Sequence, residues 1–310
     1  MSAWPELDWS SWRETAIGLQ LRTQIVGKVR LALTPWLNHS WHVPLYITAR
    51  GLGSSAIPVG DRVLQIDFDL IADTVVFATS DGGVKTVPLA AGSIAGFHGA
   101  VVEALASLGV TTSFDGTPSE MPGALPFAVD HADRPYDAEA ARRFWRALIQ
   151  AERVFGQFRT GFLGKASPTH FFWGSFDLAS TRFSGRDAPR HPGGLPGLPD
   201  DVTCEAYSHE ESSVGFWPGS DAWPHASFYA YAYPAPTGYG AAKVEPAEAF
   251  YSNEMGEFLL PYDAVSTAAD PDAALLAFCQ STYDAAADLA HWDRDALECP
   301  LGRPRVPREV

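Results

Sequence analysis

The chain carries one short pattern twice, once in each half. VGKVR at 26–30 matches FGQFR at 155–159, so that an apolar residue, Gly and Arg fall at equivalent places. Each match lies in a segment with helical periodicity, and the next strand-forming run opens at His42 in the first half and at His170 in the second. We therefore predict an internal duplication, with chance agreement of a Gly and an Arg as the alternative.

The first half begins with a predicted amphipathic helix over residues 11–34. Apolar residues recur there at every fourth position, and Pro35 ends the pattern. The charged residues Arg13, Arg22, Lys28 and Arg30 mostly occupy the other faces. A second helix is predicted at 91–108, and Asp81-Gly82-Gly83 is typical of a hairpin turn. The strands predicted between the helices cover residues 41–51, 63–70, 74–80 and 84–90.

The second half repeats this order of elements. Helical periodicity covers 137–163, and Asp270-Pro271 opens a last helix that runs to Leu289. Two segments rich in Pro and Gly, 186–201 and 234–246, are predicted to be surface loops or lids. The predicted strands of this half cover residues 170–180, 203–216, 227–234 and 257–265.

These patterns predict an α+β fold made of two pseudo-repeats. Each repeat has the order helix, four-stranded antiparallel sheet, helix, and we expect both to pack as one compact unit. The predicted boundaries are 1–117 for the first repeat, 118–135 for a linker, 136–297 for the second repeat with its long loops, and 298–310 for a tail.

The charge balance narrows the choice of partners. The chain has 22 Lys and Arg against 37 Asp and Glu, a formal net charge of −15, and no basic cluster of the kind that binds phosphates. We therefore expect neither nucleic acid nor a membrane surface as a partner. No apolar run has the length of a membrane helix. Cys204, Cys279 and Cys299 form no CxxC pair and are typical of reduced thiols, which favours a cytoplasmic location.

Alternation along the predicted strands assigns their faces. Leu64, Ile66 and Phe68 point to one side of their strand, and the polar residues between them point to the other. In the strand at 227–234, the small Ala230 and Ala232 let a helix pack closely, which leaves the tyrosines on the opposite face. We predict one concave, aromatic and ionisable surface in the second half, lined by His170, Glu205, His209, Tyr229, Tyr231 and Tyr233.

The ionisable residues of this surface suggest two kinds of chemistry. Imidazoles and a carboxylate from different strands suit a divalent metal ion, either zinc or iron, with His42, His170, His209 and Glu205 as the candidate ligands. Without a metal, a histidine beside a carboxylate serves acid–base catalysis, which makes His170, His209 and Glu205 the candidate catalytic residues. The alternative is separate histidines that hydrogen-bond at strand ends, since no HExxH motif occurs.

A second set of residues is predicted to bind the substrate. Arg50 and Arg182 lie late in the first strands of the two halves, where a guanidinium group could clamp a carboxylate or phosphate. Pairing with a nearby aspartate is the alternative use of each arginine. The aromatic members of the predicted substrate site are Trp173, Tyr229, Tyr231 and Tyr233.

Several longer motifs together resemble a known family. They are NHSWHVPLY at 38–46, SPTHFFWGSFD at 167–177, EAYSHE at 205–210, FYAYAYP at 228–234 and GEFLLPYDAV at 256–265. The chain resembles, from about Trp4 to Trp292, an uncharacterised bacterial family known as domain of unknown function 5996. The resemblance implies a soluble bacterial protein, and it implies no activity, ligand or catalytic residue.

Three functions fit this sequence. The leading hypothesis is an enzyme that acts on a small molecule in the aromatic, His- and Glu-lined pocket, with or without a divalent metal ion. The first alternative is a protein that binds a small molecule on the same surface without catalysis. The second is a scaffold whose aromatic face forms a homodimer.

Overall fold

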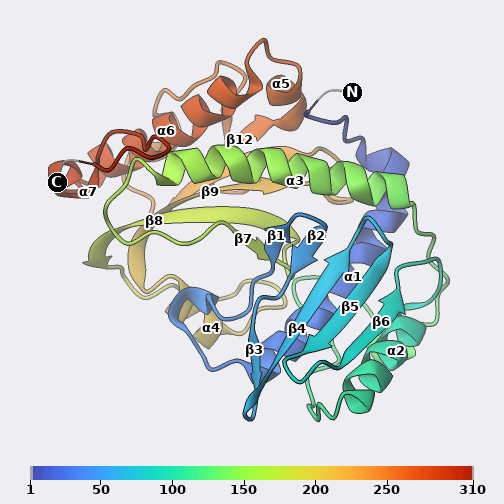
Figure 1. Ribbon diagram of the computed structural model, residues 1–310. Coiled ribbons are helices and arrows are strands. Elements are labelled where there is room, and N and C mark those ends of the chain that lie inside the picture. The colour runs from blue at the N-terminus through green and yellow to red at the C-terminus, as the bar shows by residue number, and fades with distance from the viewer. Residues whose placement is uncertain (1–2, 309–310) are drawn as a thin grey trace.

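Two six-stranded antiparallel sheets, one from each half of the chain, form the framework of the protein (Figure 1). The structure is a computed structural model that describes residues 3–308. The first sheet has the order β1-β2-β4-β5-β6, with β3 paired to β4, and the second has the order β11-β12-β10-β9-β8-β7. This arrangement confirms the predicted α+β class, although each sheet has six strands where four were predicted.

The strands have the following bounds. The first sheet contains β1 (Tyr46–Thr48), β2 (Gly51–Gly53), β3 (Ile57–Val59), β4 (Arg62–Asp69), β5 (Thr74–Thr79) and β6 (Val84–Pro88). The second sheet contains β7 (His170–Phe172), β8 (Asp177–Asp187), β9 (His209–Trp217), β10 (Ser227–Tyr233), β11 (Phe250–Ser252) and β12 (Glu257–Pro261).

Helices cover one face of each sheet, and α3 lies above strands of both (Figure 1). Aspartate or serine caps the start of the four longest helices, as in α3, where Asp137 accepts from the amide of Ala140. The α-helices are α1 (Trp9–Leu33), α2 (Ile94–Ser107), α3 (Ala138–Arg159), α4 (Asp200–Ala206), α5 (Tyr262–Ser266), α6 (Pro271–Leu289) and α7 (Arg294–Leu297). Single 3-10 turns form η1 (Asn38–Ser40), η2 (Phe127–Val129) and η3 (Tyr239–Ala241).

The two sheets meet edge to edge at a single bridge. The amide of Leu45 donates to the carbonyl oxygen of Phe171 at 2.9 Å, and the amide of Phe171 donates back to Leu45 at 2.8 Å. Leu45 precedes β1 and Phe171 lies in β7, so the first strands of the two halves are neighbours. This placement agrees with a duplication, but the pseudo-repeat itself stays a prediction.

The charged residues on the other faces of α1 do not all lie at the surface. Arg22, Lys28 and Arg30 are all buried, because α1 runs through the interior of the protein. Arg30 shows how the interior accommodates a charged side chain of this helix. Its guanidinium group donates to the carbonyl oxygens of His42, at 2.7 Å, Pro44 and Ser54. These irregular segments have no sheet partner for those carbonyls, so the buried arginine satisfies them.

The alternation predicted for β4 is confirmed, whereas several predicted strands have wrong bounds. Leu64, Ile66 and Phe68 are buried in β4, and the residues between them are more exposed. The strand predicted at 41–51 begins only at Tyr46, and residues 173–176 interrupt the strand predicted at 170–180. The predicted strand at 203–216 begins only at His209, because residues 200–206 form α4. Glu205 therefore lies on a helix and does not share a strand face with His209.

None of the helices in the described part of the chain combines the length and the apolar composition that crossing a bilayer requires.

Candidate functional site

The face of the second sheet that points away from α3 and α6 carries an acid–tyrosine cluster, made of Asp177, Glu211, Tyr207, Tyr229 and Tyr231 with Glu120 and Glu257 at its margins. The alternation along β10 explains the tyrosines. Ala230 is buried against the helices, and the rings of Tyr229 and Tyr231 stack on the other face with centroids 6.1 Å apart. Cross-strand pairing places Glu211 opposite Tyr233 and Gly215 opposite Tyr229.

Asp177 is one of the two buried carboxyl groups at the centre of the cluster, with 6% of its surface exposed. It accepts hydrogen bonds from the hydroxyl groups of Ser175 and Tyr229. Tyr229 reaches Asp177 by lying across Gly215, where a Cβ atom would come within 3.0 Å of the tyrosine ring. Burial raises the pKa of Asp177, and the two hydrogen bonds oppose that rise.

Glu211 forms the second centre of the cluster. It is 5% exposed and accepts a hydrogen bond from the hydroxyl of Tyr231 at 3.4 Å, and Tyr231 in turn accepts one from Tyr207 at 3.4 Å. Burial raises the pKa of Glu211 to about 8, although the hydrogen bond from Tyr231 and the charge of Lys165 act in the opposite direction. At neutral pH this carboxyl group is therefore mostly protonated.

Two further carboxyl groups border Asp177. Burial, reinforced by the charge of Asp177, raises the pKa of Glu120 and that of Glu257 to about 7 in each case. Within residues 3–308, no ion pair joins Asp177, Glu211, Glu120 or Glu257 to a lysine, arginine or histidine. The cluster therefore combines several carboxyl groups, and none of them forms an ion pair with a described cationic side chain.

Two segments from outside the sheet cover this face. The first, around Glu120, is fixed to α1 because Gln24 donates to the carbonyl of Ser119 at 2.8 Å and accepts from its amide at 2.7 Å. The second is the loop after β8, where the ring of His191 stacks on Tyr207 with centroids 4.8 Å apart. The amide of Glu120 donates to Gly197 of that loop at 3.4 Å, so the two covers meet.

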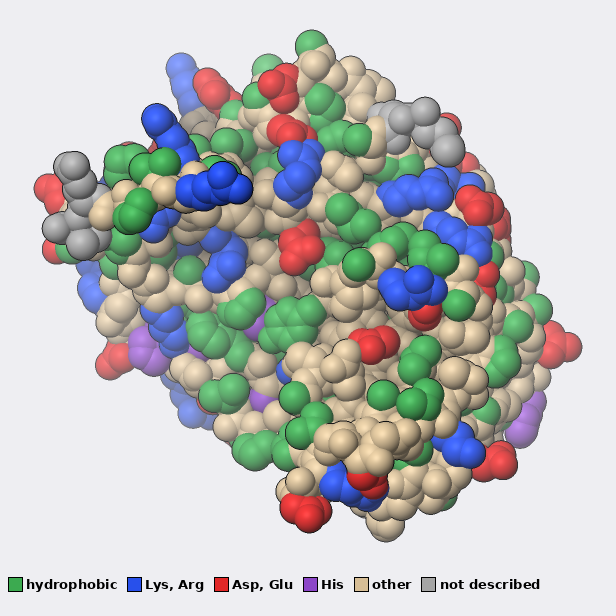
Figure 2. Space-filling view, viewed as in Figure 1, with side chains coloured by type: hydrophobic (Ala, Val, Ile, Leu, Met, Phe, Trp, Pro, Cys, Tyr) green, Lys and Arg blue, Asp and Glu red, His purple; other side chains and the backbone are tan. Residues whose placement is uncertain are grey.

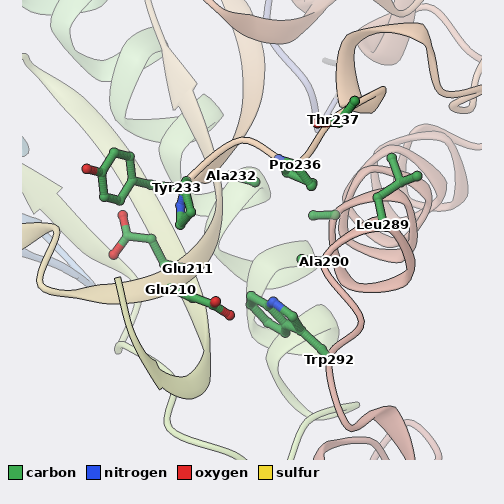
Figure 3. Close-up of a pocket in the computed structure, with 11 residues that line it drawn as sticks. Glu210, Glu211, Ala232, Tyr233, Pro236, Thr237, Leu289, Ala290 and Trp292 are labelled. Carbon is green, nitrogen blue, oxygen red and sulfur yellow. The ribbon is translucent and has the colours of Figure 1, made fainter. Parts of the chain in front are cut away.

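A cavity of about 330 Å³ opens at the end of the β9–β10 hairpin, beside the cluster. Figure 3 shows Glu211 and Tyr233 on one side of the hairpin and the carboxyl group of Glu210 on the other, directed toward Trp292. The opposite wall comes from the loop after β10 and from the last turn of α6, including Leu289. Glu211 therefore belongs both to the cluster and to the wall of the cavity.

The predicted catalytic residues Glu205 and His209 both adjoin His39. The amide of His39 donates to the two carboxylate oxygens of Glu205 at 3.0 and 3.2 Å, and its ring lies 5.6 Å from that of His209. The Nε2 atom of His39 lies 2.6 Å from Nζ of Lys165. His209 itself lies 3.6 Å from a carboxylate oxygen of Asp187. These contacts give Glu205 a structural role in holding the η1 turn.

The other two predicted histidines lie apart from this group. His42 is buried and accepts from the amide of Leu37 at 3.2 Å, and its ring lies tilted against that of Trp36 with centroids 4.5 Å apart. His170 is 1% exposed, and neither of its ring nitrogens has a hydrogen-bond partner. Burial, together with the nearby positive charges of Arg159 and Arg30, lowers the pKa of His170 to about 3. His170 is therefore a neutral side chain at any physiological pH.

The four predicted metal ligands are not brought into one coordination sphere. Among residues 3–308, no group of three or more His, Cys, Asp or Glu side chains is arranged to hold a metal ion. His42, His170, His209 and Glu205 make the separate contacts described above, and the metal site stays a prediction.

Comparison with known proteins identifies the family. The sequence profile of a family of unknown function, DUF5996, matches residues 4–299. The chain belongs to this family. The match confirms the resemblance carried by the sequence motifs. Searches of the curated proteins and of the solved structures gave no match to the chain.

In this DUF5996 chain, three predicted substrate-binding residues make structural contacts. Arg50 pairs with Asp69 at 2.6 Å. Arg182 lies on the helix side of the second sheet, where its guanidinium group stacks on Phe158. The indole nitrogen of Trp173 donates to the carbonyl of Val43 at 2.9 Å in the interior. The predicted tyrosines, in contrast, lie on the polar face, and Tyr233 donates to the carbonyl of Pro189 at 2.9 Å.

The sequence interpretation missed the carboxyl groups that dominate the DUF5996 site. Asp177 was not among the predicted site residues, although its place in a predicted strand was a usable signal. Glu120 lies in the segment predicted to be a linker, and no local pattern links that segment to a sheet in the other half. Gly174 offered an indirect signal, because a Cβ atom there would collide with the carboxyl group of Glu120.

Proposed function

We propose that this DUF5996 protein is an enzyme that acts on a small molecule carrying a cationic amino group, bound at the acid–tyrosine cluster. One observation supports the proposal above the others: four carboxyl groups share this region with tyrosine rings, and none forms an ion pair with a described residue, although the charge of Lys165 acts on Glu211. Burying carboxylates without a cation is costly, and a bound ammonium group supplies the missing charge. Tyrosine ring faces also attract cations.

The carboxyl groups have different roles in this proposal. Asp177, already oriented by Ser175 and Tyr229, receives the ammonium group. Glu120 and Glu257, whose pKa values are raised to about 7, transfer protons, because general acid–base catalysis is most efficient when the pKa lies near the working pH. Glu211 donates a hydrogen bond from its protonated carboxyl group at the edge of the cavity.

Binding is tested by thermal denaturation with simple amines. Benzylamine and agmatine should raise the melting temperature, more at pH 8 than at pH 6, because the carboxyl groups lose their protons over that range. Benzyl alcohol, a neutral isostere of benzylamine, should have no effect. The variant Asp177→Asn should abolish the response, and Glu254→Gln, which removes an exposed carboxylate from the β11–β12 turn, should retain it. Equal responses to the amine and the alcohol would overturn the proposal.

Catalysis is tested separately from binding. The wild-type protein and Asp177→Asn are each incubated with a bacterial small-molecule extract, and the cationic components are followed by mass spectrometry. We expect the wild-type protein to consume a cationic component that Asp177→Asn leaves unchanged. A component that is retained by the protein but not converted would favour the non-catalytic binding protein over the enzyme.

A further inference from the structure

Where the two sheets meet, two arginines form no ion pair with an acidic side chain of the described residues. Arg30, at the end of α1, is buried and donates to three carbonyl oxygens. Arg159, at the end of α3, is half-buried, and its guanidinium group forms no hydrogen bond or ion pair with any described residue. Arg159 follows Phe158, whose carbonyl oxygen accepts from Arg182 of β8, the strand that pairs with β7. The charges of Arg30 and Arg159 both act on His170 of β7 and lower its pKa. In a chain with a net charge of −15, two arginines without an acidic partner in one place are unusual.

His170 is the buried histidine on which these two arginines act. It is 1% exposed, and both of its ring nitrogens lack partners among residues 3–308, although buried polar atoms are normally hydrogen-bonded. A neutral imidazole always carries one N–H donor, so His170 has a donor with nothing to receive it. Arg159 adds a second unused donor, because its buried Nε atom also has no partner.

Aromatic side chains surround the histidine and are themselves partly exposed. The rings of Trp41, Tyr46 and Phe172 lie 5.9, 5.8 and 5.4 Å from the ring of His170. All three are half-buried, so a buried histidine lies beneath a rim that solvent reaches. Figure 2 shows histidine side chains between hydrophobic ones in a hollow on the face below α3. An aromatic rim above unused polar donors is the usual build of a small-ligand site.

We propose that this junction site, formed by Arg30, Arg159 and His170 beneath Trp41 and Tyr46, binds the oxyanionic group of a small ligand, either a carboxylate or a phosphate. Arg159 donates to the anion, and His170 donates from its single N–H. Arg30 contributes its charge from behind Tyr46, whose ring lies 5.5 Å from the guanidinium carbon. The aromatic rim contacts the remainder of the ligand.

The junction site is independent of the amine site proposed above. It contains none of the residues of the acid–tyrosine cluster, and it attracts the opposite charge. Arg30 and Arg159 are also the two arginines that the short sequence match pairs with each other. The predicted duplication would therefore account for one arginine from each half at the place where the first strands of the two halves join.

The experiment is calorimetric titration of the full chain with sodium benzoate and, separately, with inorganic phosphate, in a chloride buffer. We expect one of the two to bind with a stoichiometry of one. Benzoate binding alone would identify a carboxylate ligand, and phosphate binding alone a phosphate ligand. The variant Arg159→Met should weaken that binding by about 10- to 100-fold, because a charged hydrogen bond is lost. His170→Phe, which fills the same space without a donor, should weaken it similarly.

The matched control is Arg146→Met, which removes the same charge from a half-buried position of the same helix, roughly 20 Å away along α3. Its affinity should equal that of the wild-type protein. Equal weakening in Arg146→Met and Arg159→Met would show that only overall charge matters, and would overturn the proposal. Absence of binding of both anions to the wild-type protein would also overturn it. His170→Phe supplies a second test, since its histidine has no hydrogen bond whose loss would disturb folding.

Discussion

Tyr229 extends across strand β9 and donates a hydrogen bond from its hydroxyl group to the buried carboxylate of Asp177 in β8. This contact joins strands that are not adjacent, and it exists only because Gly215 leaves the sheet surface free beneath the tyrosine ring. The site thus depends on Tyr229, whose side chain spans a strand, and on Gly215, which has no side chain.

The first prediction concerns Gly27, which packs closely against the ring of Trp173. A Cβ atom at Gly27 in α1 would lie within 3.0 Å of the Trp173 ring, so Gly27→Ala should lower the free energy of unfolding by about 1–3 kcal/mol. At Gly156, its counterpart in the predicted repeat, an added Cβ atom would meet no atom within 4 Å outside its own helix. Gly156→Ala should therefore stabilise α3 by about 0.5–1 kcal/mol. Urea denaturation measures both, and a stabilising Gly27→Ala would contradict the packing.

The pH dependence of stability gives the second prediction. Burial raises the pKa of Glu211 to about 8, whereas a glutamate in an unfolded chain titrates near ~4.3. Between these values the folded state holds a proton that the unfolded state has lost. The stabilisation from this group is therefore complete below about pH 4.3 and is lost as the pH rises through about 8, with a slope of up to about 1.4 kcal/mol per pH unit.

Glu211→Gln resembles the protonated carboxyl group and should not show this loss. Relative to the wild-type protein, its free energy of unfolding should rise steadily from pH 5 to pH 8 in urea titrations. Glu254→Gln, in an exposed turn, should instead follow the wild-type profile. Parallel curves for Glu211→Gln and the wild-type protein would show that Glu211 is ionised in the folded state, with Lys165 as the nearby charge that would favour it.

Glu205 provides the third prediction, because its contacts assign it a structural role. Its carboxylate accepts from the amide of His39, which lies at a positive φ of 57° in η1. Glu205→Ala leaves that amide without a partner and should lower the free energy of unfolding by about 1–3 kcal/mol. Glu205→Gln keeps an acceptor oxygen and should lose less. Unchanged unfolding of Glu205→Ala would count against the structural role and restore Glu205 as a catalytic candidate.

The sequence predicted elements whose signals are local. Asp270-Pro271 marks the start of α6, and Asp81-Gly82-Gly83 connects β5 to β6, because caps and tight turns depend on a few adjacent residues. The polar side of α1 could not be predicted in this way. Its arginines are buried because distant irregular segments present free carbonyl groups to them, and helical periodicity carries no information on such partners.

The same difference between local signals and distant contacts applies to the candidate site. The tyrosines of β10 could be assigned to one face, because alternation with alanine is a property of the strand itself. The convergence of Glu120 on Asp177 could not, since it depends on a covering segment fixed to α1 by Gln24 and Ser119. For the same reason, the positive charge around His170 could not be predicted from the sequence, because Arg30 and Arg159 belong to different helices.

Arg182 gives the last prediction, which separates a buried structural cation from a substrate-binding one. Its guanidinium carbon lies 3.5 Å from the ring centroid of Phe158 and 4.3 Å from that of Tyr283. Its Nε and Nη1 atoms have no hydrogen-bond partner in the described part of the chain. Burial lowers the pKa of Arg182 to about 10, which reflects the cost of enclosing the charge. Arg182→Met fills similar space without that cost, so its free energy of unfolding should match or exceed that of the wild-type protein. Arg182→Ala leaves a cavity between α3, α6 and the sheet and should lose about 2–5 kcal/mol in urea denaturation. A loss in Arg182→Met as large as that in Arg182→Ala would mean that the stacked guanidinium charge itself stabilises the fold.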